Sequence, residues 1–174
     1  MKFRFHVLGL PHTRTTEEYL ACAYTQKVLK FCKMMTQRGH HVIHYGTAGS
    51  DPICSEDVES LSEETYQKVY GDHDFKSKLF KFSTSDPAYK EFYRRGIEEV
   101  GKRKKKNDFI LPFWGGGTRP ICDAHEDECI VVEPGIGYAG GHWARWKIFE
   151  SHALLHAYKG LNSVGTCNMS WYET

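Results

Sequence analysis

Long apolar runs, an excess of one charge and a dense set of cysteines are all missing from this sequence of 174 residues. No run reaches the roughly 18 apolar residues of a membrane span, and the start "MKFRFHVLGLPH" alternates like a strand instead of resembling a cleaved leader. A formal net charge of +1 gives no general attraction to nucleic acid or anionic membranes. We therefore expect a cytoplasmic protein with no transmembrane segment and no nucleic-acid partner.

Metal-binding and hydrolase signatures are also weak or missing. The six cysteines are too scattered for the disulfide framework of a small secreted domain. Cys122, His125 and Cys129 have a suggestive spacing, but structural zinc needs four ligands in two close pairs, so we predict no metal. The G-x-S-x-G signature of α/β hydrolases does not occur. The basic run 102–106 has two open interpretations, a solvated helix end and a phosphate-binding patch.

What the sequence does contain is an alternation of strand and helix patterns over residues 1–174, expected to form one domain. Residues 3–8 and 40–46 have strand patterns, and Thr15 with Glu18 forms a capping box for a helix that ends at Gly39. Apolar residues at helical spacing give this helix its core-facing stripe: Leu20, Tyr24, Val28, Phe31 and Met35.

The second half continues the alternation. After an irregular stretch over 47–85, interrupted only by a short helix at 62–70, Asp86-Pro87 begins a helix that ends at the basic run. The further predicted elements are strands at 108–114 and 129–133, a helix over 145–158 and a strand at 162–166. This order predicts a Rossmann-like, doubly wound, mostly parallel sheet in a three-layer α/β/α fold.

Three glycine-containing loops follow predicted strands: "GLPHTRTT", "WGGGTRP" and "PGIGYAGGHW". The carboxyl ends of parallel strands share one edge, where ligands of such sheets bind. Each loop taken alone is equally consistent with a tight turn. Together they supply our predicted substrate-binding residues: Gly9, Thr13, Gly115, Gly116, Gly135, Gly137, Tyr138, His142 and Arg145.

Gly135, Gly137 and Gly140 match the G-x-G-x-x-G pattern of dinucleotide-binding proteins. That fingerprint belongs to the first strand–helix unit and needs an acidic residue about 20 positions later. Here the motif lies in the last unit, and residues 154–157 are apolar or histidine. We therefore interpret these glycines as part of a loop that serves another ligand.

Two titratable residues are the candidate catalytic groups. His12 follows the first strand without an obvious core role, and imidazole exchanges a proton near neutral pH. Glu133 ends a buried strand at the glycine loop, where its carboxylate could bind hydroxyl groups or act as a base. A carboxylate that only accepts hydrogen bonds from loop N–H groups is an equal alternative for Glu133.

The stretches "LGLPHTRTT", "DFILPFWGGG" and "VVEPGIGYAGGHWARWKIFESHALLHAYKG" resemble the N-terminal half of glycosyltransferases built from two Rossmann-like domains, the GT-B architecture, and are similar to family 4 of the sequence classification. The resemblance covers nearly the whole chain and is most specific in "EPGIGY" and the following "FES". It implies transfer of a hexose from a nucleotide sugar, the co-substrate, to a hydroxyl acceptor that is a glycan, a protein or a small molecule.

In that family the N-terminal domain mainly receives the acceptor, and a C-terminal domain binds the sugar nucleotide. The resemblance places Gly9, His12 and Thr13 on one wall of the cleft and residues 133–138 on another. His12 would orient the acceptor in a retaining enzyme, whereas His12 or Glu133 would be the base in an inverting one. Because the donor-binding domain and its E-x₇-E signature do not follow here, we expect a second domain or chain to supply them. The alternatives are a non-catalytic nucleotide- or sugar-binding module and a small hydrolase or nucleoside-processing enzyme.

Overall fold

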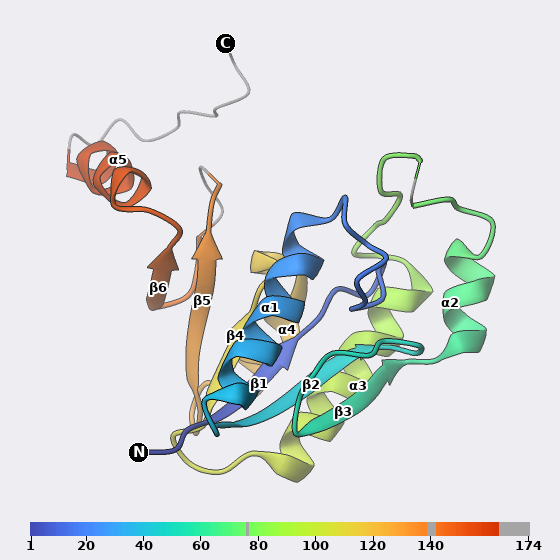
Figure 1. Ribbon diagram of the computed structural model, residues 1–174, viewed down its shortest axis with the longest axis horizontal. Helices are drawn as coiled ribbons and strands as arrows, with labels where there is room; N and C mark the ends of the chain where they lie inside the picture. Colours follow the sequence, from blue (N-terminus) through green and yellow to red (C-terminus); the bar gives the residue numbers. More distant parts are fainter. Residues whose placement is uncertain (76, 139–141, 164–174) are drawn as a thin grey trace.

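The chain folds around a six-stranded sheet whose strand order is β3-β2-β1-β4-β5-β6 (Figure 1). The structure, a computed structural model, describes residues 1–75, 77–138 and 142–163. Its strands are β1 (Arg4–Leu8), β2 (His41–Thr47), β3 (Glu56–Leu61), β4 (Phe109–Pro112), β5 (Ile130–Ile136) and β6 (Trp146–Phe149). Every pairing between these strands is parallel, which confirms the predicted Rossmann-like class.

Helices cover both faces of the sheet. They are α1 (Ala23–Gln37), α2 (Glu63–Tyr70), α3 (Pro87–Arg103), α4 (Arg119–Asp123) and α5 (His152–Ser163), with the short 3₁₀ helix η1 (Gly115–Thr118) before α4. Val132 of β5 packs in one core cluster with Val28 of α1, whereas Val131 packs in the other with Phe92 of α3. A strand buried on both faces needs apolar residues at successive positions, which explains why β5 lacks alternation.

None of the described helices combines the length and the apolar composition that crossing a bilayer requires.

The first helix begins later than the capping box predicts. α1 starts after Cys22, which makes no side-chain cap, and the hydroxyl of Thr15 lies 3.0 Å from Nε2 of His44 instead of capping a helix. Thr16 accepts a hydrogen bond from the backbone N–H of Glu18, a local turn that competes with helix formation. The prediction of a helix from Thr15 is therefore wrong, and Leu20 lies outside the helix with 76% of its surface exposed.

The middle of the chain is more ordered than its composition indicates. Residues 56–61 form the edge strand β3, which the sequence analysis missed because half of this acidic segment faces solvent. The short helix is confirmed as α2, and Ser62 caps it by accepting from the N–H of Thr65 at 3.4 Å. α3 begins at Pro87 as predicted.

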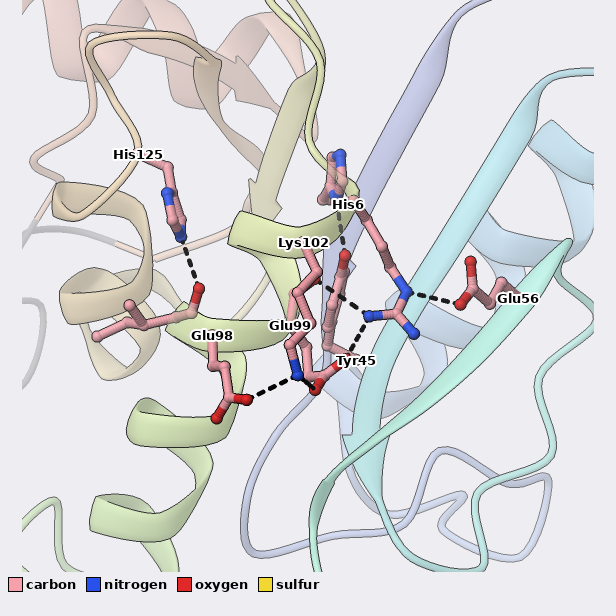
Figure 2. Close-up of polar contacts among 9 residues, drawn as sticks. His6, Tyr45, Glu56, Glu98, Glu99, Lys102 and His125 are labelled. Atoms are coloured by element: carbon pink, nitrogen blue, oxygen red, sulfur yellow. Dashed lines mark hydrogen bonds and ion pairs between the residues drawn. The ribbon is translucent and has the colours of Figure 1, made fainter.

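In the basic run at the end of α3, Lys102, Arg103 and Lys104 pair with carboxylates, and those of Lys102 are labelled in Figure 2. Arg103 donates to Glu56 at 2.6 Å and pairs with Glu99 on its own helix. Lys102 donates to both Glu98 and Glu99, at 2.6 and 2.7 Å. These partners take up the charge that a phosphate would need, so the geometry favours the ion-paired helix end over the phosphate patch.

The predictions for the C-terminal third fail at two points. Residues 146–149 form β6, parallel to β5, and the last helix is α5, so the helix predicted over 145–158 is wrong at its start. Pairing with β5 overrides the helical periodicity here, because backbone hydrogen bonds to a neighbouring strand are invisible to a local pattern. Residues 162–163 end α5 instead of beginning a strand, and 164–166 lie outside the described residues.

Two leucine substitutions test the revised start of α1. Leu20→Ala should change the free energy of unfolding by less than about 0.5 kcal/mol, because an exposed side chain leaves no cavity when truncated. Leu8→Ala, the matched control at a fully buried position of β1, should cost about 2–5 kcal/mol. Chemical denaturation measures both, and a loss at Leu20 as large as at Leu8 would restore the longer helix.

Candidate functional site

The strand order reverses between β1 and β4, because the chain leaves β1 towards β2 and β3 and later returns to the other side. In open α/β sheets, ligands bind at this reversal, outside the carboxyl ends of the strands. The loop after β1 brings His12 to this place, and the loop after β4 brings Trp114. The predicted residue His12 therefore meets the second predicted loop at the expected edge, through Trp114, which was not among the predicted site residues.

His12 is enclosed by aromatic rings and is only 1% exposed. Its imidazole stacks on Phe82 with ring centroids 4.4 Å apart and planes 13° apart. Trp114 meets the same imidazole edge-on at 5.2 Å, and Tyr89 of α3 lies parallel to it at 6.1 Å. We call His12, Phe82, Tyr89 and Trp114 the switch-point cluster.

Hydrogen bonds fix the protonation of this cluster. Trp114 donates through Nε1 to the Tyr89 hydroxyl at 3.0 Å, and this hydroxyl lies 2.8 Å from Nδ1 of His12. All three groups are satisfied when the hydroxyl donates to Nδ1 and the imidazole carries its proton on Nε2. Burial lowers the pKa of His12 to about 4, so the imidazole is neutral at neutral pH. A group with this pKa is a poor general base there and is better suited to orienting a ligand.

Glu133 is fully buried inside β5, which continues to Ile136, so the prediction that Glu133 ends the strand is wrong. Its Oε1 accepts from the Tyr138 hydroxyl at 2.5 Å and its Oε2 from the backbone N–H of Trp143 at 3.2 Å. A Cβ at Gly115 would lie 2.9 Å from the Tyr138 oxygen, so glycine is needed for this close packing. We call Glu133, Tyr138 and Gly115 the carboxylate cluster.

Tyr24, at the start of α1, joins the two clusters. Its ring lies 4.9 Å from Trp114, edge-on, and 6.1 Å from Tyr138. A carboxylate has capacity for about four hydrogen bonds, and Glu133 accepts two from the described residues. The carboxyl edge of the sheet thus combines aromatic rings with a fully buried carboxylate.

The loop glycines of β5 support this arrangement without forming a helix N-terminus. Gly135 has φ +61° inside β5, and its carbonyl accepts from Nζ of Lys27 at 2.9 Å. Lys27 also pairs with Glu150, and a Cβ at Gly137 would overlap that carboxylate. The ion pair ties α1 to the end of β6. Gly140 lies outside the described residues.

Some of the remaining predicted residues are packed against other parts of the protein, and others are exposed. Gly9 donates its N–H to the carbonyl of Tyr45 at 2.8 Å, and the buried hydroxyl of Thr13 lies 2.7 Å from that of Thr25. Both therefore hold the loop after β1 in place. Gly116 is exposed, and apart from its chain neighbours no atom of the described residues lies within 4 Å of where a Cβ would stand. Gly116 is thus the position of this loop with room for a ligand.

His142 and Arg145 lie between β5 and β6 and not at the start of a helix. His142 donates through Nε2 to the carbonyl of Tyr138 at 2.9 Å, so it backs the carboxylate cluster. Arg145 is exposed and lies over the Trp146 ring at 5.3 Å, beside the outermost strand β6. The structure thus brings His142 to the predicted site, but not Arg145.

A threonine, a histidine and an aspartate form a hydrogen-bonded chain that the sequence did not indicate. Thr15 Oγ1 lies 3.0 Å from His44 Nε2, and His44 Nδ1 lies 2.7 Å from Asp57 Oδ1. This is the order of nucleophile, base and acid in hydrolases. Thr15 is 1% exposed, however, and Gly9 packs against its hydroxyl. These hydrogen bonds fasten the loop after β1 to β2 and β3, and they leave no room for a substrate at the Thr15 hydroxyl.

Cys122, His125 and Cys129, whose spacing resembles that of metal ligands, have structural roles instead. His125 donates through Nε2 to the carbonyl of Ile97 at 3.0 Å (Figure 2), and burial raises the pKa of both thiols, that of Cys129 to about 11. Protonated thiols are poor metal ligands. Within residues 1–75, 77–138 and 142–163, no three His, Cys, Asp or Glu side chains are grouped as metal ligands.

A large groove lies beside the switch-point cluster, between α1 and α2. It has a volume of about 1130 Å³ and is lined by residues 14 and 16–20, one side of α1, and parts of 49–53 and 66–75. We call it the α1–α2 groove. None of the sequence-predicted site residues lines it. The periodic stripe of α1 indicated only core packing, so nothing in the sequence pointed to this surface.

Sequence reasoning also missed the aromatic partners of His12. Trp114 stood in the quoted "WGGG" loop, which was the one available signal, but Tyr89 fitted the core face of α3 and Phe82 lay in a segment predicted to be irregular. Their contacts with His12 bridge 70 to 102 positions of sequence. Contacts of that range leave no local pattern.

The buried imidazole should make stability depend on pH. Since the folded pKa of His12 is about 4 against an ordinary 6.5, the unfolded chain binds a proton first as pH falls. The contribution of neutral His12, about 3 kcal/mol in total, is present above pH 6.5 and is lost between pH 6.5 and 4. His12→Gln should flatten this part of the stability profile in denaturation experiments.

His152→Gln is the matched control, because His152 is an exposed histidine on α5. Its pH profile should match that of the wild type. Burial also lowers the pKa values of His6 and His125. Both residues remain in the wild type and in the two variants, so their contribution to the pH dependence of stability is the same in all three. Equal slopes for His12→Gln and the wild type would contradict a buried neutral imidazole.

Comparison with known proteins leaves the site to be judged on its own geometry. No protein-family model matches the chain, and no curated protein or solved structure matches it either. The chain is therefore placed in no family, and the resemblance to glycosyltransferases stays a hypothesis.

Proposed function

We propose that the chain is the acceptor-side, Rossmann-like domain of a glycosyltransferase that moves a hexose from a nucleotide sugar to a hydroxyl acceptor. The observation that carries the proposal is the buried Glu133 carboxylate at the carboxyl edge of the sheet, held by Tyr138 and bordered by aromatic rings. Carboxylates accept hydrogen bonds from sugar hydroxyls, and aromatic surface covers the apolar faces of sugar rings. The proposed co-substrate is a nucleotide sugar, without a metal.

The division of roles follows from the protonation of the two candidate residues. His12 is neutral and enclosed, so we assign it to positioning the acceptor side of the site through the switch-point cluster. In this proposal Glu133 binds a hydroxyl group of the substrate after the Tyr138 hydroxyl bonded to it moves aside, because the carboxylate is fully buried as it stands. Binding of the nucleotide is assigned to a further domain or chain, so catalysis requires that partner.

A non-catalytic nucleotide- or sugar-binding module is the second candidate. The specific observation in its favour is that His12 and Glu133 are only 1% and 0% exposed, which leaves neither candidate residue accessible as a base. The two proposals differ in turnover: a transferase domain supports hexose transfer once donor and acceptor are held together, whereas a binding module does not.

The test is saturation-transfer NMR of the whole chain with uridine and guanosine diphosphate hexoses, run beside a hexose-release and transfer assay. Because the acceptor-side domain faces the hexose, saturation should fall on hexose protons more than on base and ribose protons. Saturation confined to base and ribose protons in a folded sample would contradict the acceptor-side assignment. Hexose binding without transfer, even with a donor-binding partner supplied, would favour the module.

Glu133→Gln should weaken hexose binding by about tenfold, because the substitution removes a charged acceptor while keeping its size. Glu98→Gln is the matched control, since Glu98 is an exposed carboxylate on α3 at the other end of the sheet (Figure 2). The same NMR titration measures both variants, with thermal unfolding to verify that each is folded. Equal affinity of Glu133→Gln and the wild type would remove Glu133 from the site.

A further inference from the structure

The α1–α2 groove continues into the switch-point cluster through aromatic contacts. Phe75 lines the groove and stacks on Phe80, with centroids 5.5 Å apart and planes at 26°. Phe80 in turn meets the His12 ring at 5.7 Å. A ligand lying along the groove therefore ends beside the place where the acceptor is proposed to react.

The groove offers a rigid apolar platform. Tyr19 is half-buried on its lining, and its hydroxyl lies 3.0 Å from that of Tyr66. The amide of Gln26 donates to the carbonyls of Thr16 and Tyr19, which holds this loop against α1. Leu20, next in sequence, is 76% exposed. Exposure of a large apolar side chain beside a fixed aromatic ring is the arrangement expected of a binding surface.

The charges around the platform are mixed. Three cationic and four acidic side chains line the groove: Arg14, Lys30, Lys33, Glu17, Glu18, Asp51 and Asp74. Arg14 is itself engaged, since it donates to Glu63 at 2.8 Å and lies over the Tyr66 ring at 4.8 Å. Without an excess of positive charge, the groove is poorly suited to phosphates or nucleotides.

We propose that the α1–α2 groove binds a neutral oligosaccharide, the acceptor glycan of the proposed transferase. This inference rests on the proposed function and narrows its acceptor from any hydroxyl compound to a glycan. A sugar ring has an apolar face that fits Tyr19 and Leu20, and hydroxyl groups that match donors and acceptors of both signs. The volume exceeds the roughly 300–1,000 Å³ typical of small-ligand pockets, which suits several linked rings.

The experiment is a titration of the ¹⁵N-labelled whole chain with neutral oligosaccharides and no nucleotide sugar. The probes are oligomers of glucose, galactose, mannose and N-acetylglucosamine, from disaccharides upward. At least one series should shift the amide signals of residues 14–20 and 26–33, with affinity rising with the number of rings. No shift in these amides with any series, or a shift caused only by uridine or guanosine diphosphate, would overturn the inference.

Two aromatic substitutions locate the binding. Tyr19→Ala should weaken oligosaccharide binding by about tenfold or more, the size of one lost aromatic contact. Trp146→Ala is the matched control, because Trp146 is 54% exposed on β6, at the far edge of the sheet. Unchanged affinity in Tyr19→Ala, or an equal loss in Trp146→Ala, would place the binding elsewhere and overturn the assignment to the groove.

The two proposals fail in different ways. Transfer of hexose to a small acceptor, with the groove amides unmoved by every oligosaccharide, would overturn the glycan inference and leave the transferase standing. Oligosaccharide binding in the groove without hexose transfer, even with a donor-binding partner supplied, would support carbohydrate recognition there and overturn the transferase.

Discussion

Parallel strands need crossover connections, and in this chain the connections first run to one side of β1 and then return to the other. Because such crossovers share one handedness, helices cover both faces, and every strand ends at the same edge. That constraint brings the loops after β1 and β4 together with the end of β5 (Figure 1). His12, Trp114 and Glu133 meet there only because the strand order reverses between β1 and β4.

The two titratable candidate residues at this edge are held by hydrogen bonds and are not exposed for proton transfer. His12 is neutral and satisfied through Tyr89, and Glu133 is held by Tyr138 and a backbone N–H. Burial of both groups is possible because each has a hydrogen-bond partner. The aromatic rings that enclose His12 also connect it with the α1–α2 groove through Phe80. A series of aromatic contacts therefore joins His12 to the α1–α2 groove.

Much of the fold was predictable from local patterns. Pro87 began a helix, Ser62 capped another, and Gly39 ended α1 with φ +76°, as their backbone preferences require. The failures occurred where distant partners override local preference. The Thr15 hydroxyl contacts His44, 29 positions away, instead of capping a helix, and residues 146–149 pair with β5 as a strand. A capping box or a helical stripe involves only neighbouring residues, so it gives no sign of such distant contacts.

The sequence by itself determined the class of the fold, the edge at which its loops gather and the titratable residues that those loops carry. These follow from strand and helix periodicity and from the position of glycines, which are properties of neighbouring residues. Only the tertiary structure decided that His12 is enclosed and neutral, that Glu133 is bound by Tyr138, and that a groove lies between α1 and α2. Burial and long-range contact set the protonation and exposure of a side chain, and neither is encoded in its near neighbours.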